Sequence, residues 1–232
     1  MIRWAFRTLA AIVGLLVAAF LAYQGYVALR LWWWDEHNPT STAFMDARLS
    51  AMREKNPAAK LKQQWVPYLK ISNNLKRAVL VAEDDKFADH EGFDWDGIQR
   101  AMEKNEKKGK VVAGGSTITQ QLAKNLFLSG NRSMIRKGEE ALITVLMEHI
   151  LDKERILEIY LNVIEWGDGV FGAEAASRHY YGVSASQLSV EQAARLAAMV
   201  PRPRFYDRNR NAPWLMKKTQ IIIERMPRAQ LP

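Results

Sequence analysis

The chain has 232 residues, with 33 Lys and Arg against 25 Asp and Glu, a formal net charge of +8 and no cysteine. This length accommodates one globular domain of ordinary size and an additional segment. The absence of cysteine excludes disulfides, thiolate metal sites and cysteine nucleophiles. The basic balance favours an anionic partner: nucleic acid, anionic lipid headgroups or a phosphorylated substrate.

The additional segment is an apolar run near the N-terminus. Residues 8–29 contain no charged side chain. A helix needs about 20 apolar residues to cross the hydrocarbon core of a bilayer. We therefore predict a short N-terminal segment over residues 1–8 and a single transmembrane anchor over residues 9–30.

The residues at the two ends of this run predict its orientation. Arg3 and Arg7 precede it, so the positive-inside rule puts the N-terminus in the cytoplasm and the following domain outside. Tryptophans flank the run on both sides, as they do at membrane interfaces. The alternative, a cleaved signal peptide, has a shorter apolar core and a small-residue cleavage site. A domain outside the cytoplasm rarely meets nucleic acid, so the membrane surface and lipid phosphates are the predicted anionic partners.

The rest of the chain has the pattern of a mainly α-helical domain. Residues 35–64 are polar and mixed. We predict a linker and membrane-proximal segment with one short helix over residues 31–70, and residues 71–232 form the predicted domain. Residues 103–110 are so highly charged that we expect an exposed, mobile loop, and the glycines of residues 167–172 predict a tight turn between helices. No run shows the alternation expected of a strand. The predicted helices begin near residue 71 and continue over residues 117–128, 132–151, 153–161, 173–181 and 188–199.

A first group of polar residues begins at Glu83, where an apolar helical run ends. If that helix continues, Glu83, Phe87 and His90 share one face. Apolar neighbours should raise the pKa of Glu83, because desolvation penalises the charged carboxylate. A raised pKa suits a general acid or base that works near neutral pH. The nearby Asp85 and Asp89 fit an exposed helix end, and the group lacks the spacing of a calcium loop.

A second group follows at residues 114–127, with the sequence GGSTITQQLAKNLF. The glycine pair allows the backbone to approach a ligand closely. Thr117 and Gln120 have the spacing of a capping box, so we expect a helix to begin here with free N–H groups for an anion. An ordinary capped helix would explain that pair alone, but not the glycines together with Gln121 and Lys124. A nucleotide-binding P-loop is excluded, because its Gly-Lys-Ser/Thr ending is absent.

A third group contains Arg136, Lys137 and Glu140. Arg136 and Glu140 are four residues apart, which by itself predicts only a surface ion pair. We expect their helix to bury an apolar face on another side and to leave the three charged groups free to line a cleft. The apolar side chains expected to be buried there are Leu142, Val145, Leu146 and Ile150.

These groups, in this order, resemble the motifs of the peptidoglycan glycosyltransferase family, whose members polymerise lipid II into glycan strands. The resemblance implies a lysozyme-like helical domain with a small membrane-dipping jaw lobe. The chain lacks a Ser-x-x-Lys motif, so it is similar to the monofunctional members without a transpeptidase domain. The segments that carry the resemblance lie within residues 75–201 and read EDDKFADHEGFD, GGSTITQQLAKNLF, RKGEE, ILEIYLN and LSVEQAARLAAMVP.

The resemblance also implies roles for individual residues. Glu83 takes the position of the catalytic base, and Glu140 that of a second acidic residue that organises the phosphate site. The tail departs from the family pattern around Arg202 and Arg204, so the basic residue that contacts phosphate there stays open. The positions implied to bind substrate or pyrophosphate are Asp84, Phe87, His90, Ser116, Thr117, Gln121, Lys124, Asn125, Arg136 and Lys137.

The implied reaction transfers the lipid-linked glycan chain to the 4-hydroxyl of an acceptor N-acetylglucosamine, with inversion and release of undecaprenyl pyrophosphate. No tightly bound cofactor is expected, although a divalent cation, Mg²⁺ or Mn²⁺, could assist the leaving group. The implied partners are lipid II, the nascent strand, membrane lipids and other cell-wall synthesis or division proteins. The implied location is the inner membrane, with the catalytic domain in the periplasm.

Two rival interpretations stay open from the residues alone. A wall hydrolase or lytic transglycosylase would also use a catalytic glutamate, but it needs no pyrophosphate site. A non-enzymatic membrane scaffold gives no reason for Glu83 and Lys124 at these spacings.

Overall fold

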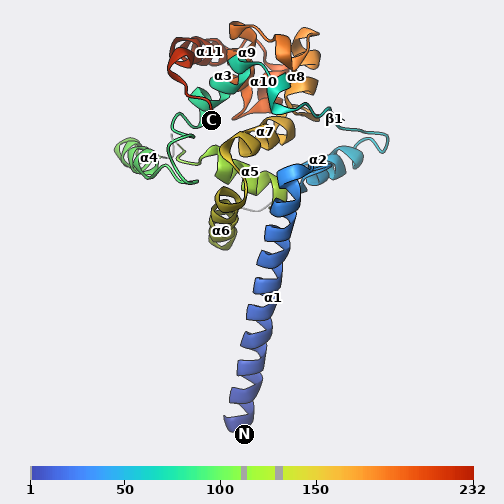
Figure 1. The fold of residues 1–232 in the computed structure, drawn as a ribbon, viewed down its shortest axis with the longest axis vertical. Helices are drawn as coiled ribbons and strands as arrows, with labels where there is room; N and C mark the ends of the chain where they lie inside the picture. The colour runs from blue at the N-terminus through green and yellow to red at the C-terminus, as the bar shows by residue number, and fades with distance from the viewer. Residues whose placement is uncertain (1, 111–113, 129–132) are drawn as a thin grey trace.

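A helical body carries one long helix, α1 (Ile2–Glu36), which projects from it as a rod (Figure 1). The structure is a computed structural model that describes residues 2–110, 114–128 and 133–232. Its α-helices after α1 are α2 (Ala43–Arg53), α3 (Asn73–Glu83), α4 (Trp95–Lys108), α5 (Ile118–Phe127), α6 (Met134–Ile150), α7 (Lys153–Val163), α8 (Ala173–Tyr181), α9 (Val190–Met199), α10 (Pro203–Arg208) and α11 (Pro213–Arg225). Short 3-10 helices lie at Tyr68–Lys70, Ala185–Gln187 and Met226–Arg228. The fold is mainly α, as the hydrophobic periodicity predicts.

The part of α1 that projects from the body has the length and composition of a membrane-spanning helix. Phe6–Glu36 is long and apolar enough to cross a bilayer, with a mean hydropathy of 2.0 over its most apolar stretch. The C-terminal end of α1 enters the body, where Val27, Leu31 and Trp34 are buried. Arg155 of α7 donates from its guanidinium to the carbonyl oxygen of Trp34 at 2.8 Å. The predicted anchor is therefore continuous with a helix end that packs in the hydrophobic core.

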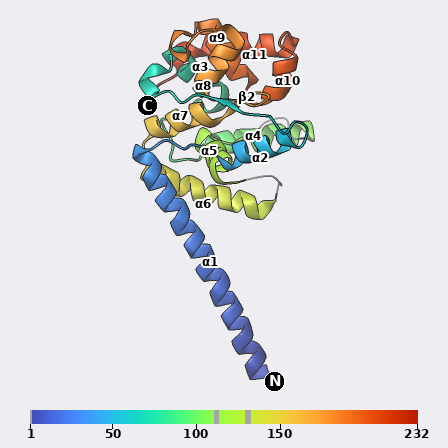
Figure 2. The same cartoon turned by 90° about the vertical axis from the view of Figure 1, so that its right-hand side faces the viewer.

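The core has two connected parts. α3, α9 and α11 pack together at the end of the body away from α1, and α7 lies between them and α5 (Figures 1 and 2). Most of α7 is buried, because α5, α8 and the 3-10 helix at Tyr68–Lys70 pack against it. Side-chain caps begin several of these helices and satisfy N–H groups that have no partner within the helix. They are Ser72 for α3, Ser133 for α6, Asp152 for α7 and Ser189 for α9.

A small sheet joins residues that are distant in the sequence. Its order is β1 (Lys62–Gln63), β3 (Val170–Phe171), β2 (Glu165–Gly167); β1 runs parallel to β3, and β2 antiparallel. The sequence predicts no strands, and that expectation is wrong because elements of two or three residues are too short to show alternation. The glycine segment forms the β2–β3 turn and then leads into α8, with Gly169 and Gly172 at positive φ. Through β1 and through α2, which packs on α5, the predicted linker lies against the domain.

The charged segment before the glycine pair is helical where we predicted a loop. α4 covers residues 95–108 and ends at Gly109, which adopts the left-handed conformation. Asp94 caps its start by accepting from the N–H of Gly97 at 2.9 Å. Lys and Glu are good helix formers, so a highly charged sequence can form a solvated helix when it is capped at both ends.

α6 also differs from its prediction. Leu142 and Val145, expected to be buried, are 46% and 42% exposed, whereas Ile143 and Met147 are fully buried. The helix is rotated relative to the expected orientation, because its packing against α5 and α1 decides which face is covered. As a result α6 exposes apolar side chains beside α1, at the lower edge of the body (Figures 1 and 2).

Candidate active site

Glu83 lies at the C-terminal end of α3, where the chain leaves the helix. Asp84 takes an extended φ of −162° and ends the helix, so the expectation that Glu83, Phe87 and His90 share one helical face is wrong. The Glu83 side chain is only 10% exposed. Gln121 of α5 donates from Nε2 to Glu83 Oε2 at 3.0 Å, and the Tyr160 hydroxyl donates to Gln121 Oε1 at 2.9 Å. Since the hydroxyl fixes the amide oxygen on its own side, the amide nitrogen faces the carboxylate.

A lysine from the far end of the chain completes the surroundings of Glu83. Lys218 of α11 places Nζ 3.8 Å from Glu83 Oε1. Oε1 is buried and has no hydrogen-bond partner among the described residues. Burial raises the pKa of Glu83, and Lys218 and Gln121 oppose that rise only in part. The predicted raised pKa of Glu83 thus has the expected physical cause.

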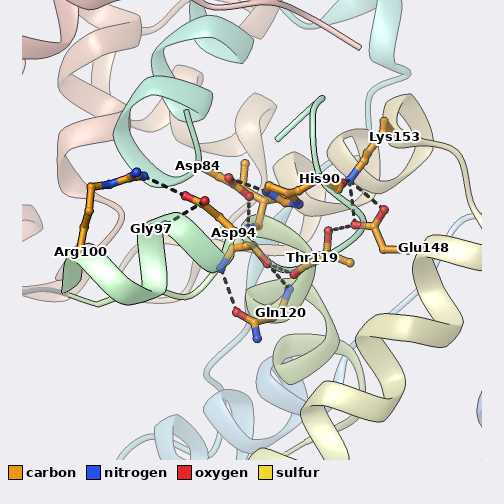
Figure 3. A network of polar contacts seen from close by, with 12 residues as sticks. Asp84, His90, Asp94, Gly97, Arg100, Thr119, Gln120, Glu148 and Lys153 are labelled. Atoms are coloured by element: carbon orange, nitrogen blue, oxygen red, sulfur yellow. Dashed lines mark hydrogen bonds and ion pairs between the residues drawn. The ribbon is translucent and has the colours of Figure 1, made fainter. Parts of the chain in front are cut away.

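Asp84 links the end of α3 to the start of α5. Its Oδ1 lies 2.9 Å from His90 Nε2, and its Oδ2 accepts from the N–H of Ile118 at 2.9 Å (Figure 3). A carboxylate at a helix N-terminus is stabilised by the helix dipole. The expectation that the first N–H groups of α5 are free for a substrate anion is therefore wrong at Ile118, where Asp84 is the anion.

Phe87 and His90 form the support behind this link. Phe87 is buried and meets the His90 ring edge-on at a centroid distance of 6.4 Å. The Lys153 ammonium lies 4.5 Å from the centre of the Phe87 ring and donates to the His90 carbonyl oxygen at 2.6 Å (Figure 3). Direct contact of Asp84, Phe87 or His90 with substrate stays a prediction, while their part in positioning the loop is visible in these bonds.

A cavity of about 170 Å³ opens beside Glu83. It brings the end of α3 together with the glycine segment and the start of α5, so Ser116 and Thr117 lie at the same cavity as the carboxylate. Gly115 is required here by α4, because a Cβ would come within 2.9 Å of the Ile98 Cα. The cavity is lined by Val81, Ala82, Glu83, Asp84, Asp85, Asp94, Gly97, Gly114, Gly115, Ser116 and Thr117.

α5 begins as its sequence predicts. Thr117 and Gln120 form a capping box in which each side chain bonds the backbone N–H of the other residue. Its apolar side chains Ile118, Leu122 and Leu126 are buried, and Gln121 and Lys124 lie on the other side of the helix. Lys124 is exposed, and its positive charge opposes part of the rise that burial causes in the pKa of Glu83. Asn125 follows it and is half-buried.

The third polar group is a compact charge cluster on α6. Glu140 is buried, and it accepts from Arg136 Nη1 at 3.3 Å and from the Lys137 ammonium. The group is therefore more than an exposed ion pair, and the expectation that all three side chains are free is wrong for Glu140. One carboxylate holds two cations side by side, which leaves a net positive cluster.

The sequence alone does not identify two residues that surround Glu83, Lys218 and Tyr160. Lys218 lies in the tail after Pro201, the segment in which the basic residue that contacts phosphate was left open. The two arginines considered in that tail have other partners. Arg204 Nε lies 3.3 Å from Glu165 Oε2, and the Arg202 guanidinium lies over the Phe205 ring. Within the described ranges no group of three or more His, Cys, Asp or Glu side chains could hold a metal ion.

Comparisons with known proteins show the family of this chain. The family model described as Transglycosylase matches residues 50–227. A biosynthetic peptidoglycan transglycosylase of Janthinobacterium sp. (strain Marseille) is 62% identical over 216 residues, which cover 93% of this chain and 94% of the relative. Proteins with the same description from Chromobacterium violaceum and Laribacter hongkongensis are 61% identical over 226 residues (97% and 99% covered) and 58% identical over 232 residues (100% of both). The chain therefore belongs to the transglycosylase family, whose catalytic domain has a lysozyme-like helical fold.

Proposed function

We propose that this chain polymerises lipid II into peptidoglycan glycan strands, as an inverting glycosyltransferase. The observation that carries the proposal is the buried Glu83 carboxylate beside a cavity, in a chain 62% identical to a biosynthetic peptidoglycan transglycosylase. The lipid-linked glycan chain is transferred to the 4-hydroxyl of an acceptor N-acetylglucosamine. Undecaprenyl pyrophosphate is the leaving group.

Glu83 acts as the general base in this proposal. Its carboxylate takes the proton of the acceptor 4-hydroxyl while that oxygen bonds to the anomeric carbon of the donor. The bond from that carbon to the phosphate oxygen breaks, and its electron pair leaves with the pyrophosphate. Burial supports the role, because it raises the pKa of Glu83 and makes the carboxylate a stronger base. Gln121 and Lys218 keep it oriented and ionised.

In this proposal, the cations of α5 and α6 stabilise the departing pyrophosphate. Lys124 extends from the helix face that carries Gln121, and Arg136 and Lys137 are held together by Glu140. Fixed positive charge placed where negative charge develops lowers the barrier of such a transfer. A divalent cation, Mg²⁺ or Mn²⁺, would supply further positive charge for the leaving pyrophosphate if the reaction uses one.

The membrane holds the enzyme at its substrates. α1 anchors the chain in the inner membrane as a single span with the N-terminus in the cytoplasm, and the catalytic domain is periplasmic. This topology is supported by the length of the apolar helix and by Arg3 and Arg7 before it. The exposed apolar side of α6 lies beside α1 and dips into the bilayer as the jaw lobe. Lipid II, the nascent strand and membrane lipids are the partners, with other cell-wall proteins a further expectation.

Incubation of the purified full-length chain with lipid II in proteoliposomes tests the proposal. We expect long, uncross-linked strands and released undecaprenyl pyrophosphate. The rival hydrolase would instead cleave finished strands and leave lipid II unchanged, and a scaffold would do neither. Parallel incubation with isolated uncross-linked glycan provides that comparison. Cleavage without polymerisation would refute the proposed function.

A further inference from the structure

α10 and α11 carry a row of aromatic rings that begins next to the catalytic base. Lys218 connects the base to the first of these rings. Its Nζ lies 3.8 Å from Glu83 Oε1 and 5.5 Å from the centre of the Trp214 ring. Trp214 and Lys218 are four residues apart on α11 and therefore share one face. A single lysine side chain thus spans the distance from the base to an indole ring.

The row continues from Trp214 onto α10. Trp214 stacks almost parallel on Tyr206, with a centroid distance of 5.9 Å and an interplanar angle of 8°. Tyr206 meets Phe205 edge-on at 5.1 Å, and the Arg202 guanidinium lies 4.4 Å from the centre of the Phe205 ring. We call Trp214, Tyr206 and Phe205 the aromatic track. It leads away from Glu83 and ends at a cation.

The middle ring of the track is buried, and the two outer rings are exposed to solvent. Tyr206 is buried, whereas Trp214 is 53% and Phe205 41% exposed. The buried ring fixes the position of the indole, and the exposed rings offer apolar surface to solvent. Lys218, which contacts both Glu83 and Trp214, links this surface to the active site. Burial of these rings against a ligand would stabilise binding with little loss of side-chain freedom.

We propose that the aromatic track binds the growing glycan strand as it leaves the catalytic centre. This inference rests on the proposed function and adds a strand-binding surface to it. A pyranose ring has C–H-bearing faces that pack on an aromatic ring, so Trp214 and Phe205 act as successive sugar platforms. α10 and α11 lie on the part of the body away from α1, which is where a strand extending from the membrane has to pass (Figures 1 and 2).

Charge also fits this occupant. Residues 202–218 contain six Lys and Arg and a single acidic residue, Asp207. A strand with its stem peptides carries carboxylates along its length, so it is attracted to this segment. Arg202, at the outer end of the track, is placed to meet such a carboxylate above Phe205.

The test compares strand length among full-length variants in proteoliposomes with lipid II. Trp214→Ala should release strands early and shorten them, and Phe205→Ala should do so to a smaller extent. Trp214→Phe keeps a flat ring and should restore most of the length. Met216→Ala is the matched control, because Met216 is 58% exposed on the same helix but outside the track. Thermal unfolding of each variant verifies that the fold is intact.

A binding measurement separates the track from catalysis. A soluble, uncross-linked glycan oligosaccharide that carries stem peptides but no lipid pyrophosphate is titrated into detergent-solubilised protein. We expect Trp214→Ala to weaken this binding by roughly two- to tenfold, the effect of losing one aromatic contact. Met216→Ala should leave it unchanged.

Several outcomes would overturn the inference. If the wild type polymerises lipid II but Trp214→Ala leaves strand length and oligosaccharide binding unchanged, the track is wrong and the proposed function stands. If the variant instead shifts the acid limb of the pH–rate profile, Trp214 only positions Lys218. A change in self-association in place of these effects would identify a protein-binding surface. If the wild type forms no strands, both proposals fail together.

Discussion

Replacement of Lys218 by methionine should move the pH dependence of polymerisation. Lys218 Nζ lies 3.8 Å from Glu83 Oε1, and the lysine side chain is 20% exposed. Two opposite unit charges about 4 Å apart attract each other by about 4 kcal/mol at an effective dielectric constant near 20. Solvent at the exposed part of the lysine weakens this attraction, so we expect roughly 1.5–3 kcal/mol, which is about one to two pH units.

The sign follows from the charges. Burial raises the pKa of Glu83, and the Lys218 ammonium acts against that rise by stabilising the carboxylate. Without the ammonium the pKa of Glu83 rises further, so the base is protonated over a wider range of acidic pH. The acid limb of the pH–rate profile of Lys218→Met should therefore move to higher pH, and activity should recover as the pH is raised.

The assay is the initial rate of lipid II consumption between pH 5 and pH 9 in proteoliposomes. Lys217→Met is the matched control, because Lys217 is the adjacent, exposed lysine on the same helix. Its profile should coincide with that of the wild type. An acid limb that stays in place in Lys218→Met, even with a lower overall rate, would show that the ammonium does not set the ionisation of Glu83.

The remaining predictions concern the base, the cations and the backbone. Glu83→Gln should lower the rate of lipid II consumption by about 10²–10⁴-fold or more without lowering Tm, because it removes the base and a buried charge; substantial residual turnover would identify another base. Lys124→Ala should slow the same reaction by about 1.5–3 kcal/mol in transition-state stabilisation, whereas exposed Lys107→Ala should stay within about 0.5 kcal/mol; equal, mild effects would make Lys124 an ordinary surface lysine. Gly172→Ala should destabilise the fold by at least about 2 kcal/mol in denaturant unfolding, because φ is +80° and a Cβ would lie 2.6 Å from a backbone oxygen. Gly182→Ala, with φ +69° but open space around it, should cost only about 1 kcal/mol; similar losses at both glycines would contradict the steric argument.

Much of the local structure was predictable from sequence. Periodicity located α3 and the helices from α5 to α9, but not α4, α10 or α11. Hydropathy located the apolar part of α1, and the spacing of Thr117 and Gln120 predicted the capping box at the start of α5. Glu83 could be singled out because an acidic residue follows directly on an apolar helical run. These features depend on interactions between residues a few positions apart in the chain, and the sequence shows which residues those are.

Other features were decided only by the tertiary structure. The orientation of α6 depends on what packs against it, so Leu142 is exposed although its pattern predicts burial. Strands of two or three residues have too few side chains to show a period, and the sheet exists because distant segments meet.

The surroundings of Glu83 follow the same rule. Asp84 occupies the N-terminus of α5, and Lys218 and Tyr160 reach the site from α11 and α7. Burial by the assembled domain raises the pKa of Glu83. The sequence by itself determined which side chains are available for the chemistry. The packing of helices far apart in the chain decided which of them share one low-dielectric site, because local patterns carry no information about distant partners.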